Sequence, residues 1–199
     1  ESAQTQLIDD AIQKIEARGA AVLPVFYESG AGKDDYLKLL KINGQTQADT
    51  FVNFRTLHFA NQRKVEFEAL GRPVMQALTY FEGDQASWEN SVQGISANMM
   101  AFTLVLPETA GVIEPTIVAA MDPKTGIVQI IDYQLEFLLD RALAHANLVK
   151  KVNSEKKLTL MFWGDKDMGA SFLNVPDSLR AISQRLNQDG YKLEAHSNE

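Results

Sequence analysis

The sequence predicts an α/β fold in which Rossmann-like layers of short, mostly parallel strands are covered by helices. Three observations predict it. Segments with helical apolar spacing alternate with short apolar runs, and glycine or proline bounds most of these segments. Hydrophobic residues make up 45% of the 199 residues, enough for a sizeable core. We expect an α/β domain over residues 1–150 and the start of a second α/β unit over residues 151–199.

The first half of the chain alternates regularly between the two patterns. Apolar residues from Leu7 to Ile15 share one helix face, which Gly19 ends. Because the chain opens with a helix, we expect a strand upstream of Glu1 in a longer protein. The expected order is a helix over 7–15, a strand over 21–27 marked by Pro24 as an edge or bulge, a helix over 36–40, a strand over 50–54, a polar-faced helix to about residue 70 and a strand over 73–78.

The stretch from Ser87 to Pro115 is the least generic part of the sequence. A short helix is expected from Ser87, with Gly94 as its stop. The bounded apolar run 102–106 predicts a buried strand, which Pro107 closes because proline cannot donate a ladder hydrogen bond. Glu108 would then lie just past a strand end, where open α/β sheets place their ligand crevices.

The last part of the chain predicts a hairpin, a long helix and a boundary. Residues 112–120 and 127–131 flank a proline- and glycine-containing turn and should pair as a hairpin insertion within residues 112–131. Apolar residues then recur with helical spacing within residues 132–150. The lysine-rich run 150–157 indicates a solvated linker. The second unit should hold a strand over 158–163, a helix from Pro176 with Leu179, Ile182 and Leu186 inward and Gly190 at its end, and a strand over 192–195.

Charge and composition exclude several function classes. A net charge of −7 argues against a nucleic-acid surface or an anionic membrane surface, and no apolar run approaches a membrane span of about 20 residues. The chain has no cysteine, so disulfides, thiolate nucleophiles and zinc–thiolate sites are impossible. These features fit a cytoplasmic protein, which we expect.

Few residues have the pattern of a catalytic or binding site. The loop Gly30–Lys33 lacks the glycine and the hydroxyl residue of a phosphate loop. His58, His145 and His196 lack metal-ligand spacing, so we expect no dedicated metal site. His58 follows a strand end and is the histidine most worth following. Asn53 and Gln76 lie in or beside strands and could line a crevice, although such amides more often satisfy backbone groups.

Glu108 and Trp88 each allow two interpretations. The Glu108 carboxylate could accept a proton or meet a metal ion. We favour a structural role in which it accepts backbone N–H bonds in the turn that ends at Gly111. Trp88 is expected in the core or between domains, although its flat face could also stack on a planar ligand.

The motifs around these residues also resemble a known family. A Trp88-x-x-Ser91-x-x-Gly94 helix precedes a Leu106-Pro107-Glu108-x-x-Gly111-x-Ile113-x-Pro115 turn. Together these motifs resemble the large subunit of the tetrapyrrole metal chelatases, of the CobN cobaltochelatase and magnesium-chelatase H types. Further matches, in order along nearly the whole chain, are residues 72–78, 121–126 and 170–175 with Ser178 and Leu179.

The resemblance implies an internal fragment of a much longer subunit. Such a subunit binds a tetrapyrrole (a porphyrin or corrin) and, with separate AAA+ ATPase subunits that use ATP, inserts or removes a divalent metal such as Co or Mg. The fragment itself would hold no cofactor. Glu108 and His58 are the candidate catalytic residues, and Asn53, Gln76 and Trp88 the candidate tetrapyrrole contacts. Departures from the family pattern at 54–58 and 95–98 leave the metal and the branch open.

A different class of function also fits the sequence. The chain could be a non-catalytic, two-lobed α/β module that binds a ligand or docks the ATPase, with its hinge near Lys150–Lys157. A parent reading frame several times longer would favour the chelatase interpretation.

Overall fold

The computed structural model describes residues 5–26, 35–160 and 174–193. The chain divides into two compact units, Glu1–Val149 and Lys150–Glu199. Among the described helices, none combines the length and apolar composition that crossing a bilayer requires.

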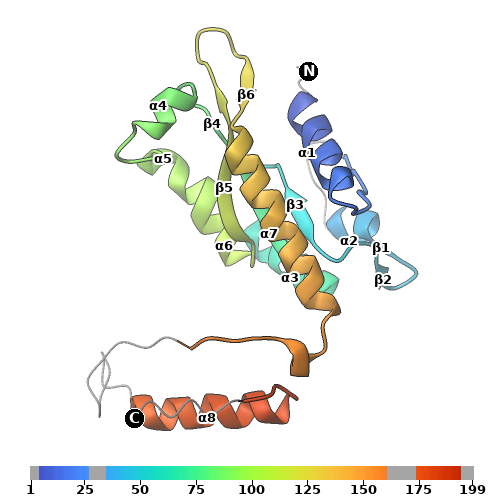
Figure 1. Ribbon diagram of the computed structural model, residues 1–199. Coiled ribbons are helices and arrows are strands. Elements are labelled where there is room, and N and C mark those ends of the chain that lie inside the picture. The colour runs from blue at the N-terminus through green and yellow to red at the C-terminus, as the bar shows by residue number, and fades with distance from the viewer. Residues whose placement is uncertain (1–4, 27–34, 161–173, 194–199) are drawn as a thin grey trace. The chain divides into compact units, whose positions relative to one another are not determined.

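A four-stranded sheet organises the first unit (Figure 1). Strands β3 (Phe51–Asn53), β4 (Val74–Tyr80) and β5 (Ile113–Met121) run parallel, and β6 (Val128–Ile130) pairs antiparallel with β5. The strand order β3-β4-β5-β6 follows the chain. The predicted α/β class and the predicted hairpin are therefore confirmed. A small antiparallel pair, β1 (Lys41–Ile42) with β2 (Gln45–Thr46), forms a separate sheet.

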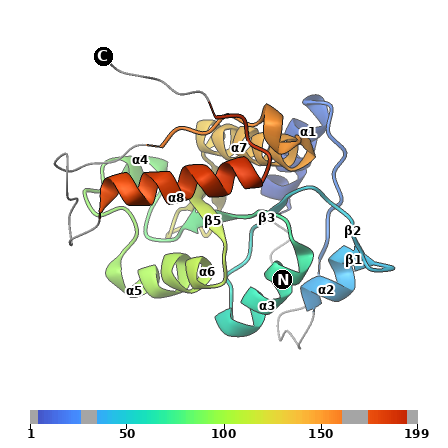
Figure 2. The ribbon, with the colours of Figure 1, turned by 90° about the horizontal axis from the view of Figure 1, so that it is seen from below.

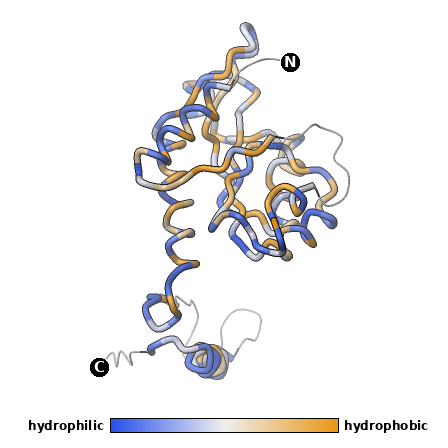
Figure 3. Tube along the Cα trace, turned by 90° about the vertical axis from the view of Figure 1, so that its right-hand side faces the viewer, coloured by the Kyte–Doolittle hydropathy of each residue, from blue (hydrophilic) through white to orange (hydrophobic). Residues whose placement is uncertain are grey.

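Helices cover both faces of this sheet (Figure 2). One face packs against α1 (Gln6–Ala17) and α7 (Asp132–Lys150). The predicted spacing of α7 is confirmed, because Leu135, Leu138, Leu139 and Ala142 are buried against Met75 and Val118. Figure 3 shows hydrophobic and hydrophilic residues alternating along this helix. The other face carries α2 (Asp35–Leu40), α3 (Ala60–Leu70), α4 (Gln85–Glu89), α5 (Ala97–Met100) and α6 (Leu106–Thr109).

The strand predicted over residues 102–106 is wrong. Residues Ala101–Val105 form a π-helical turn, η1, that continues α5 and leads directly into α6. Thr103 Oγ1 donates to the Met99 carbonyl at 2.8 Å, within this helical stretch. Pro107 lies at the start of α6, directly after this π-helical turn. A five-residue apolar run has no periodicity that separates a strand from a helix, and here the preceding helix decides.

The strand predicted over residues 21–27 is also absent from the described part, residues 21–26. This segment has no regular secondary structure, and the side chains of Leu23, Val25 and Phe26 are 53%, 42% and 91% exposed. Tyr27 and the loop 29–33 lie outside the described residues.

The second unit contains η2 (Asn153–Glu155) and α8 (Val175–Gln188). The predicted helix is confirmed: Asn174 caps it by accepting from the Asp177 amide at 3.1 Å, and Gly190 follows it with a φ of 86°. Ile182 is exposed, so its predicted inward position is wrong. Residues 158–160 and 192–193 form no strand. The rest of those two predicted strands, Trp163, His196 and the motif over 170–173 lie outside the described residues.

Candidate functional site

A buried network of amide side chains lies where β3 ends. Asn53 Nδ2 donates to Gln76 Oε1 at 2.8 Å and to the Arg55 carbonyl at 2.7 Å. Gln76 Nε2 donates to the same carbonyl at 3.0 Å. The two amides meet because Asn53 and Gln76 are register partners in the parallel pair. They satisfy each other and the backbone of the chain as it leaves the sheet.

An ion pair between α3 side chains lies beside this network. Arg63 pairs with Glu66, and both side chains are buried. Glu66 Oε1 also accepts from the Tyr36 amide at 3.1 Å, and the Arg63 guanidinium lies 5.0 Å from the Tyr36 ring centroid. Tyr36 Oη in turn donates to Asn53 Oδ1 at 3.2 Å. Since a buried charge that loses its partner is costly, these contacts fix α2 against α3 and the end of β3.

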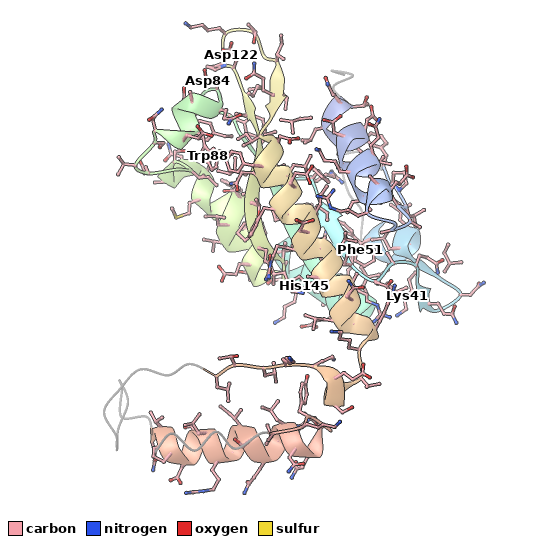
Figure 4. The ribbon with its side chains drawn as sticks, in the orientation of Figure 1. Lys41, Phe51, Asp84, Trp88, Asp122 and His145 are labelled. Atoms are coloured by element: carbon pink, nitrogen blue, oxygen red, sulfur yellow. The ribbon has the colours of Figure 1, made fainter. Side chains whose placement is uncertain are left out.

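A second charged cluster holds the start of β5. Glu114 accepts two hydrogen bonds from Arg141, at 2.8 Å from Nε and 2.5 Å from Nη2, and its Oε1 lies 2.9 Å from His145 Nε2. These hydrogen bonds, Arg141 first, lower the pKa of Glu114 to about 2. Glu114 adopts a φ of 51°, which is unusual for a residue with a side chain. Figure 4 shows His145 on α7.

An apolar groove of about 460 Å³ runs between the α4–η1 segment and α7. Trp88, Ile95, Met100 and Leu104 line one side, and Gln134 and Phe137 of α7 line the other. Its base is formed by residues of β4 and β5, including Leu78 and Ile117. Trp88, labelled in Figure 4, packs against Leu78, Tyr80 and Ile117 and also borders the groove. The expected packing of Trp88 against the core is confirmed, and stacking on a planar ligand stays a prediction.

Glu108 lies at the opposite edge of the sheet from the one predicted. It belongs to α6, which precedes β5, so it stands near the amino end of that strand. With Arg72, Pro73 and Lys64 it lines a shallow groove there. Its carboxylate is exposed and has no hydrogen bond among the described residues. The Glu108 carbonyl, not the carboxylate, accepts from the Gly111 amide at 2.9 Å, so the expected contact of the carboxylate with the turn is wrong.

His58 follows the carboxyl end of β3 and is exposed. Its ring contacts that of Phe59, with 6.5 Å between centroids. In the described part of the chain, no group of three or more His, Asp or Glu side chains is placed to hold a metal ion.

The structure thus joins two of the five candidate residues and separates the others. Asn53 and Gln76 are hydrogen-bonded, whereas His58, Trp88 and Glu108 lie in three other places. The Glu114 cluster was not predicted from the sequence. The spacing of Arg141 and His145, four residues apart on one helix face, is the signal that could have revealed half of it.

Comparison with known proteins places this chain in a family. The family model described as CobN/Magnesium Chelatase matches residues 1–199. The chloroplastic magnesium-chelatase subunit ChlH of Oryza sativa subsp. japonica is 29% identical over 198 residues, which cover 92% of this chain and 14% of that protein. The aerobic cobaltochelatase subunit CobN of Sinorhizobium sp is 27% identical over 175 residues, covering 81% of this chain and 14% of that protein.

A third relative is the H-type magnesium-chelatase protein of Chlorobaculum parvum, which is 26% identical over 209 residues and covers 94% of this chain and 16% of that protein. The chain therefore spans about one seventh of the curated relatives it matches. No solved structure matches the chain.

Proposed function

The chain belongs to the CobN/magnesium chelatase family, and we propose that it is part of a large chelatase subunit that inserts a divalent metal into a tetrapyrrole, or removes it. The observation that carries the proposal is the family match over all of residues 1–199. Relatives named for magnesium and for cobalt both match, so the metal, as substrate, stays open between them. AAA+ ATPase subunits would supply the energy of ATP hydrolysis.

In this proposal the chain supplies a scaffold and one wall of the tetrapyrrole site. The groove beside Trp88 supports that role, since Trp88, the exposed Phe137 ring, Met100 and Leu104 give it an apolar lining that suits a flat macrocycle. Gln134, on the α7 side, could hydrogen-bond a polar ring substituent.

Metal insertion also needs a base that accepts the pyrrole N–H protons. Of the two candidates, His58 lies beyond the carboxyl end of β3, the edge where α/β sheets bind ligands. Glu108 lies at the amino edge. We therefore propose His58, which lies outside the Trp88 groove, as the better candidate for proton transfer at a second part of the site, and assign Glu108 to a separate groove.

Binding of a free-base porphyrin to the chain tests the proposed wall. In a Trp163→Phe background, the fluorescence of Trp88 should be quenched saturably, and Trp88→Leu should weaken porphyrin binding by about tenfold, measured by porphyrin absorbance. Phe81→Leu is the matched control, because Phe81 is an exposed aromatic that does not line the groove, and it should bind like the parent. Equal binding by the Trp88 variant would remove the groove from the site. Binding of the ATPase subunit without any porphyrin binding would favour the docking module instead.

A further inference from the structure

The sheet has an open edge at β3. Among the described strands, β3 pairs with β4 alone. Its Phe51 amide donates to the Pro73 carbonyl at 2.9 Å, so Phe51 and Asn53 turn their backbone groups toward β4. Because alternate residues of a strand face opposite sides, the N–H and C=O of Val52 point toward the open edge. Open edges invite pairing with another strand.

An unpaired apolar segment lies shortly before α2 in the sequence. Residues 21–26 read Ala-Val-Leu-Pro-Val-Phe and form no regular structure, and Leu23, Val25 and Phe26 are exposed. Three large apolar side chains in six residues are rarely left in water without a partner. The composition is that of a strand with one proline, which is tolerated at a sheet edge.

The described sheet has two edges, β3 and β6, and the connections of the chain favour the β3 edge for such a strand. The crossover from β3 to β4 uses α3, and the crossover from β4 to β5 uses the α4–α6 segment, both on the same face. Helix α2 lies on that face as well, since Tyr36 and Leu40 pack with Phe67 and Leu70 of α3. A strand outside β3, followed by α2, would repeat the same step with the same hand. Residues 27–50 are long enough for this crossover.

The direction of the chain after α1 also agrees with a strand that runs parallel to β3. Lys14 pairs with Asp132 (2.9 Å) and Glu136 (2.5 Å), and Arg18 pairs with Asp140 (2.9 Å), so α1 runs parallel to α7. The second half of α7 lies beside the start of β5, because Arg141 binds Glu114. The end of α1 is therefore near the amino edge of the sheet. Gly19, with a φ of 80°, turns the chain there. Figure 1 shows α1 and α2 on the β3 side of the sheet.

We propose that residues 21–26 dock on the open edge of β3 as a fifth strand, parallel to β3. Pro24 has no N–H and must face away from β3, so Leu23 and Val25 are the residues whose backbone groups bond to β3. Docking covers apolar side chains and closes the edge. It also brings the end of the segment beside Asn53, so the fifth strand extends the carboxyl edge of the sheet where ligands bind.

Amide hydrogen exchange of the whole chain, resolved by residue with NMR, tests this pairing. The amides of Leu23, Val25 and Val52 should exchange at least about tenfold more slowly than those of Val22 and Phe26. Fast exchange at all of these positions, or protection without this alternation, would overturn the proposal. Protection that rises with protein concentration would also overturn it, because a second copy would then occupy the edge.

A pair of proline variants supplies the matched comparison. Val25→Pro removes a bonding N–H and should abolish the protection of Leu23 and Val52. Phe26→Pro removes an N–H that faces away from β3 and should leave that protection intact. Equal effects of the two variants would contradict the assignment of which backbone N–H groups of the segment face β3. If either variant does not fold, the exchange pattern of the unmodified chain alone decides between the outcomes.

Discussion

At the scale of single residues, the Glu114 carboxylate connects two elements of the fold. Arg141 and His145 reach it from α7, so one side chain ties the first residues of β5 to the second half of that helix. Folding lowers its pKa from 4.5 to about 2. The unfolded chain therefore binds more protons between these values, and the stabilisation is complete above about pH 5 and lost as the pH falls toward 2.

Glu114→Gln should lower the free energy of unfolding at pH 7 by about 1–2 kcal/mol. The shift in pKa would allow about 3 kcal/mol, but Arg141 is 47% exposed and solvent screens the pair. Urea melts at pH 7, 5 and 3 measure the effect, and the difference between variant and parent should shrink as the pH falls. A difference that persists at pH 3 would mean that the carboxylate charge is not its source.

Glu108→Gln is the matched control from the family-like motif. The Glu108 carboxylate is exposed and has no hydrogen bond among the described residues, so its loss should change the free energy of unfolding by less than about 0.5 kcal/mol. A loss of about 1 kcal/mol or more would restore the structural role that the sequence suggested for this residue.

The sequence predicted some of these residues and not others for a physical reason. Asn53 and Gln76 were identified because each lies in a strand, and neighbouring parallel strands bring such residues together. The contact of Glu114 with Arg141 joins residues 27 positions apart on different elements, and no local pattern encodes it. Glu108 was misplaced because its position was inferred from a strand that does not form.

At the scale of elements, helices with long periodic patterns were predictable and short apolar runs were not. The positions of Leu135, Leu138, Leu139 and Ala142 repeat over several turns, so only a helix places them on one face. The runs at 21–26 and 102–106 are too short to show a period. The first is unpaired here, and the second continues the helix that begins at Ala97.

Gly83 controls how closely α4 approaches the end of β4. A Cβ built at Gly83 would lie 2.5 Å from the Ser87 Cβ, closer than two such atoms can stand. Gly83→Ala should therefore displace α4 and lower the free energy of unfolding by about 1–3 kcal/mol, measured by urea melts. The double variant Gly83→Ala/Ser87→Gly removes the opposing atom and should recover part of that loss. No recovery would indicate that the cost arises elsewhere.

At the scale of the whole molecule, the chain consists of two units that divide at Val149 and Lys150. The residues that follow include exposed Lys151 and Lys157 on either side of η2. Such exposed, charged connections are preferred sites of proteolysis.

Limited trypsinolysis should cut first within Lys150–Lys157 and release a stable fragment that ends there, as mass spectrometry of the early products would show. Arg141 lies on α7 and pairs with Glu114 of β5, so trypsin should cut after it later; this site is the internal reference. Protection of the whole lysine run, with first cuts elsewhere, would mean that the two units behave as one domain.

The parent protein, in our proposal, is a chelatase subunit to which this chain contributes part of a wall. The most direct test follows the absorption spectrum of a porphyrin or corrin mixed with Mg²⁺ or Co²⁺ and ATP. The full-length parent with its ATPase subunits should convert the spectrum to that of the metallated ring, whereas the 199-residue chain alone should leave it unchanged. Failure of the full-length assembly with both metals and both rings, or turnover by the isolated chain, would contradict this proposal.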